Sequence, residues 1–339
     1  MLVSWNTTNQ CNMFCDHCYR DAGLKLSEEL NTEEGKELIR EIKKAGFKVM
    51  IFSGGEPLMR HDIFELGDYA RQQGLRPVLG TNGTLITSEV ATKLKEAGFA
   101  ACGVSLDSLD AAKNDSFRKL ENAFNLTLEG IDNLREAGVP FQIHTTVMDW
   151  NVGELEALTD MAVKLGAVAH HIFFLVPTGR GLNIEEEALR VREYEQTLAR
   201  IMEKQKSVDI ELKPTCAPQF IRVADKKGIP VRFSKGCLAG ISYCIISPRG
   251  DVQPCAYLDL RLGNVRETPF SHIWNENPVL QELRTMDYKG KCGICDYKAR
   301  CGGCRARAYY YSGGDYMAED SWCLYRPRET KEQEAYGQG

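Results

Sequence analysis

The sequence predicts an α/β protein, in which a partial (β/α)6 barrel of the TIM type is followed by a smaller cysteine-rich domain. Two observations support this fold class. In the first 180 residues, amphipathic helices end at a glycine and an apolar strand follows within a few residues. After about residue 212 this alternation stops, and the rest of the chain is rich in Cys, Gly and Tyr. We therefore expect a barrel domain at residues 1–206, a bridging segment at 207–236 and the cysteine-rich domain at 237–339.

The strands and helices of the barrel can be placed in order. The first helix is expected to have Asn31 or Thr32 as its cap and the acids Glu33 and Glu34 in its first turn. The glycines that end helices are Gly46, Gly74, Gly98, Gly138 and Gly166. Strands are expected at residues 2–7, 48–53, 76–81, 100–106, 141–147 and 169–176, and a last helix at 185–206. Strands that alternate with helices pair in parallel, and right-handed crossovers curl the successive units towards a barrel.

The composition excludes several classes of protein. The 339 residues include 42 Lys and Arg and 47 Asp and Glu, a net charge of −5, which argues against nucleic acid or an anionic membrane surface as a partner. No apolar run is long enough for a membrane-spanning helix. The amino terminus lacks the charged and then apolar layout of a secretory signal, so we expect a cytoplasmic protein.

Thirteen cysteines are a high number for a cytoplasmic chain, and eleven of them fall into groups with short spacings. In a reducing compartment such groups are typical of metal or iron–sulfur ligands. The first group, Cys11, Cys15 and Cys18, has the spacing CxxxCxxC and follows the first expected strand. A zinc knuckle would need a fourth ligand such as His17, whereas a four-iron cluster would keep one iron free for a substrate or cofactor.

This triad, with the aromatic His17 before its third cysteine, resembles the mark of the radical S-adenosylmethionine (radical SAM) enzymes. A second motif of that family follows the second strand, and its members here are Gly54, Gly55, Glu56 and Pro57. The resemblance implies that the three cysteines hold a 4Fe-4S cluster, and that S-adenosyl-L-methionine is the cofactor. It also implies that the glycine-rich motif holds the methionine amino group, with His17 near the cofactor. The implied chemistry is the formation of a 5′-deoxyadenosyl radical.

Further polar residues lie at the carboxyl ends of expected strands, where barrel enzymes place their sites. At positions where the family has ligand contacts, this chain has Thr81, Asn82, Ser105, Asp107, His144, Thr145 and the segment 177–181. The resemblance makes Ser105 and Asp107 candidates for binding the ribose hydroxyls. The alternatives are that Asn82 and Gly83 form a turn, and that Asp107 caps the next helix.

The cysteines after residue 236 resemble the SPASM extension of radical SAM enzymes. They form Cx12Gx4C from Cys237 through Gly250 to Cys255, then Cx2Cx5Cx2C, and end at Cys323. The resemblance implies one or two auxiliary 4Fe-4S clusters. It assigns one set, Cys237, Cys244, Cys255 and Cys304, and a second set, Cys292, Cys295, Cys301 and Cys323. Two CxxC pairs five residues apart could also form a zinc ribbon.

The bridging segment holds a further candidate, Cys216, between Pro214 and Pro218. As a catalytic residue it could ligate a haem-type iron or supply a hydrogen atom, and the alternative is a buried free thiol. Seven basic residues against one acid lie from Lys213 to Arg249, a patch that would suit a polycarboxylate ligand or be a solvated face. Three remaining candidates are expected to be core or strand residues: Cys102, His170 and His171.

Within the SPASM enzymes, the start of the chain, residues 213–220 and residues 301–308 resemble the tetrapyrrole-modifying branch. That resemblance implies a tetrapyrrole substrate with carboxylate side chains and a reducing partner such as ferredoxin or flavodoxin. We expect the removal of two acetate side chains from didecarboxysirohaem, which gives iron-coproporphyrin. The alternatives are formation of a haem d1 precursor, oxidative decarboxylation of iron-coproporphyrin to haem, and maturation of a ribosomally made peptide.

Overall fold

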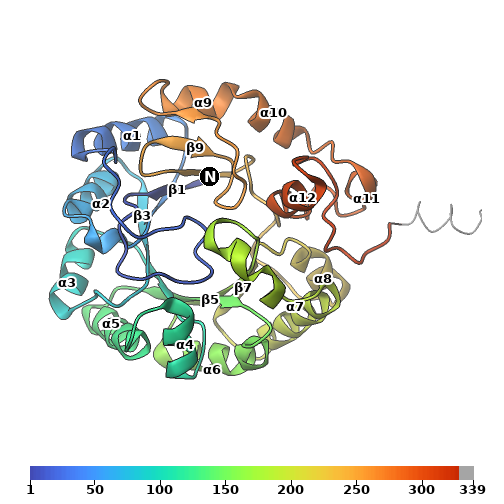
Figure 1. The fold of residues 1–339 in the computed structure, drawn as a ribbon, viewed down its shortest axis with the longest axis horizontal. Helices are drawn as coiled ribbons and strands as arrows, with labels where there is room; N and C mark the ends of the chain where they lie inside the picture. The colour runs from blue at the N-terminus through green and yellow to red at the C-terminus, as the bar shows by residue number, and fades with distance from the viewer. Residues whose placement is uncertain (328–339) are drawn as a thin grey trace, which may run out of the picture.

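The fold is built around one ten-stranded sheet that curves into an open barrel (Figure 1). The computed structural model describes residues 1–327. Across the sheet the strand order is β10-β9-β8-β1-β2-β3-β4-β5-β6-β7. The bounds are β1 Leu2–Asn6, β2 Val49–Ser53, β3 Arg76–Thr81, β4 Cys102–Ser105, β5 Phe141–Val147, β6 Ala169–Phe174, β7 Glu211–Thr215, β8 Tyr243–Ile246, β9 Asp251–Gln253 and β10 Gly263–Asn264. Strands β1 to β7 pair in parallel, which confirms the partial barrel.

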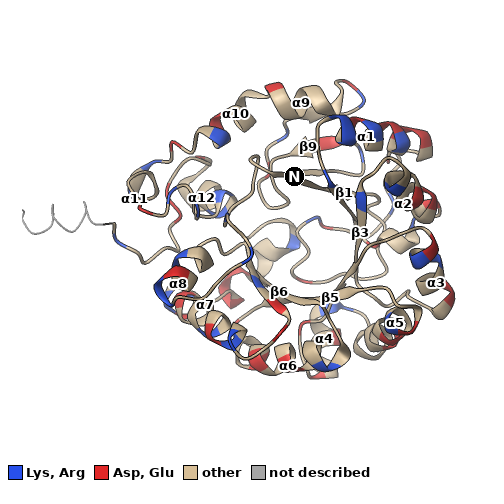
Figure 2. Cartoon of the chain, turned by 180° about the vertical axis from the view of Figure 1, so that it is seen from behind, with Lys and Arg blue, Asp and Glu red and all other residues tan. Residues whose placement is uncertain are grey.

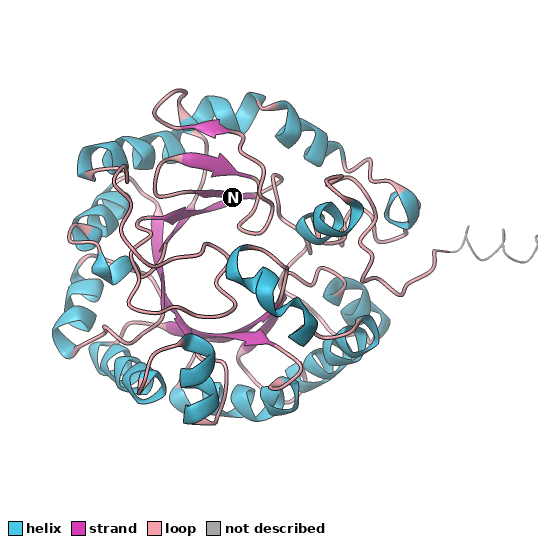
Figure 3. Cartoon of the chain, viewed as in Figure 1, coloured by secondary structure: helices cyan, strands magenta, loops and turns pink. Residues whose placement is uncertain are grey.

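A ring of helices surrounds the strands, and loops cross the opening of the barrel (Figure 3). The α-helices are α1 Thr32–Lys44, α2 Ile63–Gln72, α3 Ser88–Glu96, α4 Ala111–Arg118, α5 Ala123–Ala137, α6 Leu155–Leu165, α7 Val191–Gln205, α8 Phe220–Lys226, α9 Phe270–Glu276, α10 Pro278–Thr285, α11 Gly290–Gly293 and α12 Arg305–Ser312. Short 3-10 helices are η1 Pro57–Met59, η2 Val152–Glu154 and η3 Gly179–Glu187. The helix expected at 185–206 thus begins at Val191, after a separate turn. None of the helices in residues 1–327 has the length and apolar character needed to cross a membrane.

Local chemistry explains where the outer helices begin and end. At the start of α1, the Asn31 side chain accepts a hydrogen bond from Glu34 N at 3.0 Å, and the Glu34 carboxylate accepts one from Asn31 N at 2.8 Å. This reciprocal capping satisfies two amide donors that the helix itself leaves unpaired. The five expected helix-ending glycines all have φ between 72° and 87°, a left-handed conformation that glycine adopts without strain.

The two faces of the curved sheet differ in burial. Along β5, Phe141 and Ile143 are buried in the core between sheet and helices, whereas Gln142, His144 and Thr146 are half-buried. Successive side chains of a strand point to opposite faces, so the half-buried set lines the inside of the barrel. The interior of the barrel therefore carries polar side chains.

Two features of the sheet were not expected from the sequence. Strand β7 lies within the bridging segment and pairs in parallel with β6. Lys213 and Pro214 interrupt its apolar pattern, and an edge strand tolerates a proline because one side of its ladder is unpaired. At the other side, β8 pairs in parallel with β1 and antiparallel with β9. The cysteine-rich part of the chain thus continues the barrel sheet.

Candidate active site

The loop after β1 carries the first three cysteines and is fastened to the glycine-rich motif. Gly55 N donates to Thr8 O at 2.8 Å, and Glu56 N donates to Gln10 O at 2.7 Å. All three thiols are free and partly exposed. Two of their sulfurs accept backbone amide hydrogen bonds, Cys11 from Met13 N at 3.4 Å and Cys18 from Ala22 N at 3.5 Å.

These thiols fit an iron–sulfur cluster better than a single zinc ion. Burial, with a smaller contribution from neighbouring Glu56, Cys15 and Cys18, raises the pKa of Cys11 to about 12, so a bound cation is needed to hold the thiolate. Within residues 1–327, no three Cys, His, Asp or Glu side chains converge on a point that could hold one metal ion. The thiolates of a four-iron cluster bind different iron atoms, so they need not converge.

His17 does not complete a zinc knuckle. Its ring is stacked on Phe117, with centroids 4.3 Å apart and planes 18° apart. Burial lowers the pKa of His17 to about 4, so the imidazole is neutral at pH 7. A neutral ring within the cluster loop, stacked on Phe117, can contact a flat ligand.

Gly54 and Gly55 allow two chain segments to approach each other closely. Gly54 has φ of 150°, and a Cβ on Gly55 would lie 2.3 Å from Gln10 O. Both positions therefore exclude a side chain. Among the described residues, none donates a hydrogen bond to the carbonyl oxygens of Gly54 or Gly55. Two unpaired carbonyls beside the cluster loop suit the ammonium group of an amino acid.

Glu56 organises the end of the sheet. Its carboxylate is fully buried and accepts hydrogen bonds from Leu58 N at 3.1 Å, Thr81 Oγ1 at 2.8 Å and Asn82 N at 2.8 Å. Burial raises its pKa to about 7 in spite of these donors. Pro57 begins the 3-10 turn that Glu56 caps. The acid thus ties the end of β2 to the end of β3. When it is ionised, its carboxylate only accepts hydrogen bonds, and three donors of the protein already occupy it.

The buried Glu56 predicts a pH dependence of stability. Its folded pKa of about 7 lies above the ordinary value of 4.5, so folding penalises the ionised form. The contribution of protonated Glu56 to the free energy of unfolding is therefore fully present below pH 4.5. It is lost as the pH rises through 7, and the total loss is up to about 3 kcal/mol. We expect Glu56→Gln to remove this loss, measured by urea unfolding between about pH 5 and pH 7.5. An unchanged slope of unfolding free energy against pH would contradict it.

The other strand-end residues are joined to one another. Asn82 Nδ2 donates to Asn12 Oδ1 in the cluster loop at 2.8 Å, and its own Oδ1 accepts from Thr84 N. Gly83 has φ of 87°, so Asn82 and Gly83 form a turn that also supports the loop. Ser105 Oγ donates to Thr81 O at 3.4 Å.

Asp107 is held by an arginine that no sequence motif predicts. Its carboxylate lies 2.7 Å from Arg118 Nη2, and both side chains are buried. It also accepts from Thr146 N at 2.7 Å. The cap of α4 is instead Asp110, which accepts from Ala112 N and Lys113 N. Asp107 is therefore fully buried, and it ties the ends of β4 and β5 to Arg118.

A second arginine holds the cluster loop from far along the chain. Arg180, in η3, donates from Nε to Cys15 O at 2.9 Å and from its backbone N to Cys18 O at 3.0 Å. Gly179 permits this contact, because a Cβ there would lie 2.5 Å from Cys18 O. The segment 177–181 was a candidate, but nothing in the sequence predicted that Arg180 binds the loop backbone.

One layer of polar side chains crosses the barrel interior. In the strand register, Ser105 lies beside His144, His144 beside His171, and His171 beside Lys213. The two imidazole rings are stacked, with centroids 5.1 Å apart and planes 5° apart. Burial lowers the pKa of His144 to about 4 and that of His171 well below its usual range, so both are neutral.

His170 has a different role from this interior layer. It is fully buried, and its ring nitrogens lie 2.9 Å from Thr145 Oγ1 and 3.0 Å from Thr159 Oγ1. Both ring nitrogens are thus occupied within the protein. Cys102 is likewise a buried core residue of β4. Both assignments as structural residues are confirmed.

Much of the positive charge of the expected basic patch is balanced by acids. Four of its seven cations pair with acids from other elements: Arg222 with Glu195, Lys227 with Glu203, Arg232 with Glu211 and Arg249 with Glu28. Figure 2 shows cationic and acidic segments interspersed along the outer helices. Lys213 differs, since it lies on the inner face of β7 with its ammonium 3.6 Å from the Phe233 ring centroid.

One set of the later cysteines lines a common pocket. Its walls include Cys292, Cys295, Cys301 and Cys323. Cys292 Sγ accepts from Asp320 N at 3.4 Å, and Arg305 Nη2 lies 3.9 Å from the same sulfur. Four thiols around one pocket, with N–H donors aimed at a sulfur, suit an iron–sulfur cluster. The resemblance grouped the same four residues.

The second set is divided. Burial raises the pKa of Cys255, and the nearby thiols of Cys237 and Cys304 add to this increase. Burial and the thiol of Cys237 likewise raise the pKa of Cys304. Cys244 does not join them, because it is buried on β8 in the main core. The thiol that does join them is Cys216, which packs in one small cluster with Cys255 and Cys304.

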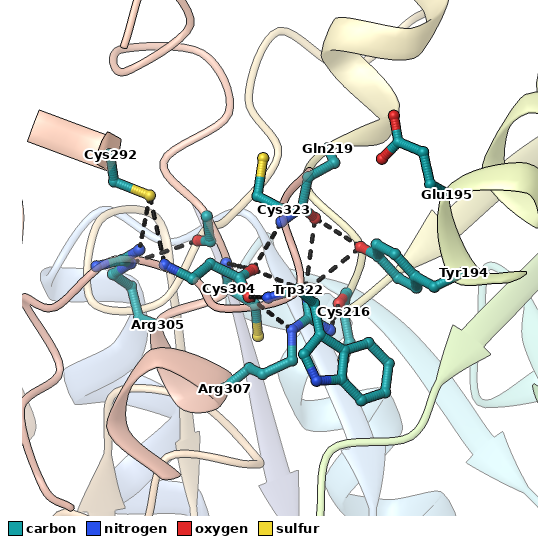
Figure 4. A network of polar contacts seen from close by, with 12 residues as sticks. Tyr194, Glu195, Cys216, Gln219, Cys292, Cys304, Arg305, Arg307, Trp322 and Cys323 are labelled. Atoms are coloured by element: carbon teal, nitrogen blue, oxygen red, sulfur yellow. Dashed lines mark hydrogen bonds and ion pairs between the residues drawn. The ribbon is translucent and has the colours of Figure 1, made fainter. Parts of the chain in front are cut away.

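A buried ion pair supports this second set (Figure 4). Arg307 and Asp320 are both fully buried, with Nη2 and Oδ2 2.7 Å apart. Asp320 Oδ2 accepts from Cys304 N at 2.8 Å and from Gln219 Nε2 at 2.7 Å. Arg307 Nη1 donates to Cys216 O at 3.0 Å. The pair therefore joins the cysteine-rich segment to the loop after β7.

Comparisons with known proteins agree with this arrangement. The chain matches the Radical SAM superfamily over residues 5–162 and SPASM, an iron–sulfur cluster-binding domain, over residues 237–304. The cofactors of this chain are therefore S-adenosylmethionine, a 4Fe-4S cluster and auxiliary iron–sulfur clusters.

Relatives extend the match over nearly the whole chain. The AdoMet-dependent heme synthase of Methanosarcina barkeri is 45% identical over 96% of this chain and 97% of its own. That of Nitratidesulfovibrio vulgaris is 43% identical over 96% and 93%. The Fe-coproporphyrin III synthase of Methanosarcina barkeri is 33% identical over 99% and 89%.

Solved structures share the fold. Streptococcus suis SuiB bound to S-adenosylmethionine superposes with a TM-score of 0.75 at 16% identity, covering 96% of this chain and 77% of that one. The anSMEcpe structure with bound AdoMet and the Cp18Cys peptide has a TM-score of 0.74 at 19% identity, covering 99% and 97%. The chain therefore belongs to the radical SAM superfamily, within the SPASM-containing family that includes the AdoMet-dependent heme synthases.

Proposed function

We propose that this chain converts iron-coproporphyrin III into haem by oxidative decarboxylation of two propionate side chains. The observation that carries the proposal is the 43–45% identity to AdoMet-dependent heme synthases, against 33% to an Fe-coproporphyrin III synthase over a similar span. The higher identity supports the oxidative decarboxylation named among the alternatives above over acetate removal from didecarboxysirohaem. Both reactions belong to tetrapyrrole biosynthesis and use the same cofactors.

The reaction has a simple balance. A propionate loses a hydrogen atom from the methylene carbon that is attached to the ring. The carbon radical then expels CO2, forms the vinyl double bond and releases one electron to a one-electron acceptor. Bound S-adenosylmethionine and its cluster supply the radical that takes up the hydrogen atom. The protein has to hold one methylene group beside that radical and exclude water.

The polar layer inside the barrel is suited to such a substrate. Lys213 offers an ammonium group to a propionate, and its half-buried position strengthens an ion pair relative to water. The neutral imidazoles of His144 and His171 can face a flat ring or ligate its iron. Ser105 and His17 remain the proposed contacts to the cofactor, whereas the buried Asp107 acts by positioning. A ferredoxin or flavodoxin is the proposed reductant.

The assay that tests the proposal compares two substrates. The reconstituted, reduced protein is incubated anaerobically with S-adenosylmethionine and either iron-coproporphyrin III or didecarboxysirohaem, and the tetrapyrrole mass and 5′-deoxyadenosine are followed. We expect haem, with loss of two carboxyl groups as CO2, from iron-coproporphyrin III alone. Formation of iron-coproporphyrin from didecarboxysirohaem, with no haem formed, would restore the acetate-removal assignment.

Lys213 predicts a defect in substrate affinity. Lys213→Met removes the ammonium group but keeps a long apolar stem, so we expect about 10-fold weaker binding of iron-coproporphyrin III, the loss of one hydrogen bond to a charged group. Lys226→Met is the matched control, because Lys226 is exposed on α8. Binding is measured from the absorption change of the tetrapyrrole, with iron content unchanged. Equal affinities in the two variants would remove Lys213 from the substrate site.

A further inference from the structure

Cys216 and Cys244 both lie outside the pocket of four thiols, and they differ in what surrounds their side chains. Cys244 lies between Cys237 and Cys255, where the SPASM resemblance assigns it to their set, whereas Cys216 lies before them in the bridging segment. The positions of their side chains decide which of them can share a cluster with Cys237, Cys255 and Cys304. This question concerns only iron ligation and does not depend on the substrate.

Cys244 faces the layer between the sheet and the outer helices. It lies on β8 in register with Val3 of β1, and both are fully buried in the main core with Ile246. Burial raises the pKa of its thiol, and the one charged group that acts on it is Arg284. Arg284 itself lies on the Trp274 ring, 4.4 Å from the centroid. No other cysteine among the described residues acts on this thiol.

Cys216 lies among the three SPASM thiols. It packs with Cys255 and Cys304 around a small apolar cluster that includes Leu258. Burial and the adjacent thiols of Cys304, Cys255 and Cys237 raise its pKa well above the usual range. Its thiol is free, so no disulfide explains the grouping.

The backbone at Cys216 is held in an unusual conformation. Its φ is 59°, in the left-handed region that non-glycine residues seldom adopt. Arg307 holds the Cys216 carbonyl at 3.0 Å, and Asp320 holds Cys304 N at 2.8 Å, so one ion pair positions both cysteines (Figure 4). The left-handed backbone of Cys216 costs free energy. A requirement that its thiol reach a fixed position beside Cys255 and Cys304 would explain this cost.

We propose that Cys216, rather than Cys244, completes the ligand set of this auxiliary cluster. The full set is Cys216, Cys237, Cys255 and Cys304. Because Cys216 directly follows β7, the cluster lies at the carboxyl end of the barrel strands. Tyr257 extends from this side to Tyr19, with ring centroids 5.3 Å apart, and Tyr19 is the neighbour of Cys18 in the first cluster loop.

The test is iron and sulfide content together with electron paramagnetic resonance of the reduced, reconstituted full chain. Cys216→Ala is expected to lose about one to four iron atoms per chain, as a three-iron cluster forms or the whole cluster is lost. Cys216→Ser, which offers an oxygen ligand, is expected to shift the resonance of one cluster. Cys244→Val, which keeps a small apolar core residue, and Cys102→Ala are expected to match the wild type.

Two results would overturn the assignment. One is a wild-type iron content and spectrum in both Cys216 variants. The other is loss of iron in Cys244→Val while its far-UV circular dichroism equals that of the wild type. If Cys216→Ala does not fold, the spectrum of Cys216→Ser decides. These readouts are independent of turnover, so a wrong substrate in the proposed function would leave them unchanged.

Discussion

Replacing Arg307 with methionine is expected to lower the free energy of unfolding by about 3–5 kcal/mol. Asp320 would then be left fully buried and unpaired, while still facing Cys304 N and Gln219. The surrounding Tyr194 and Trp322 rings, which lie 5.0 Å and 4.8 Å from the guanidinium, cannot replace its charge. The measurement is the urea midpoint of the iron-loaded chain under anaerobic conditions.

The matched control is Arg300→Met. Arg300 pairs with Asp225 at 3.1 Å, but both side chains are about half exposed, so solvent screens the pair. We expect this variant to change the unfolding free energy by less than about 1 kcal/mol. Adding Asp320→Asn to Arg307→Met should recover part of the loss, because the unpaired charge disappears. Similar small effects for both single variants would show that the buried pair does not support the fold.

The second large effect is expected from Gly55→Ala. The added Cβ would lie 2.3 Å from Gln10 O and 2.7 Å from Asn9 O, both backbone atoms that a side-chain rotation cannot move. The cluster loop must therefore shift. Since a displacement of about 1 Å can reduce a rate about 100-fold, we expect S-adenosylmethionine cleavage to fall by about that factor.

Gly153→Ala provides the control for the glycine substitution. Gly153 is exposed, and an added Cβ there meets no heavy atom within 4 Å. We expect wild-type cleavage, measured as 5′-deoxyadenosine formed per cluster. Cleavage by Gly55→Ala at the wild-type rate would mean that the loop can relax without cost, and the glycine would then have no steric role.

The sequence predicts the parts of the fold that depend on local signals. Helix-ending glycines and apolar runs predict the strands before β7, because these features act over a few residues. Strand β7 was missed because Lys213 and Pro214 hide its pattern, and its pairing depends on β6, about forty residues away. Local propensity contains no information on such a partner.

The residues of the site are likewise predictable where the signal is local in the sequence, and not where it depends on the folded barrel. Cysteine spacing identifies the first cluster and the pocket of four thiols, because neighbouring ligands on one loop are set by the chain itself. Arg118 and Arg180 were not predicted, since each meets the cluster loop or Asp107 only through the folded barrel. The SPASM resemblance also assigns Cys244 to a cluster, whereas the fold buries that thiol in the core and packs Cys216 in one group with Cys255 and Cys304.

The central claim is that this chain removes a hydrogen atom from a propionate of iron-coproporphyrin III. Its most direct test uses substrate deuterated at the ring-attached methylene carbons of the propionates, with mass analysis of 5′-deoxyadenosine. We predict deuterium in 5′-deoxyadenosine together with haem formation. Unlabelled 5′-deoxyadenosine with an unchanged tetrapyrrole would contradict the claim.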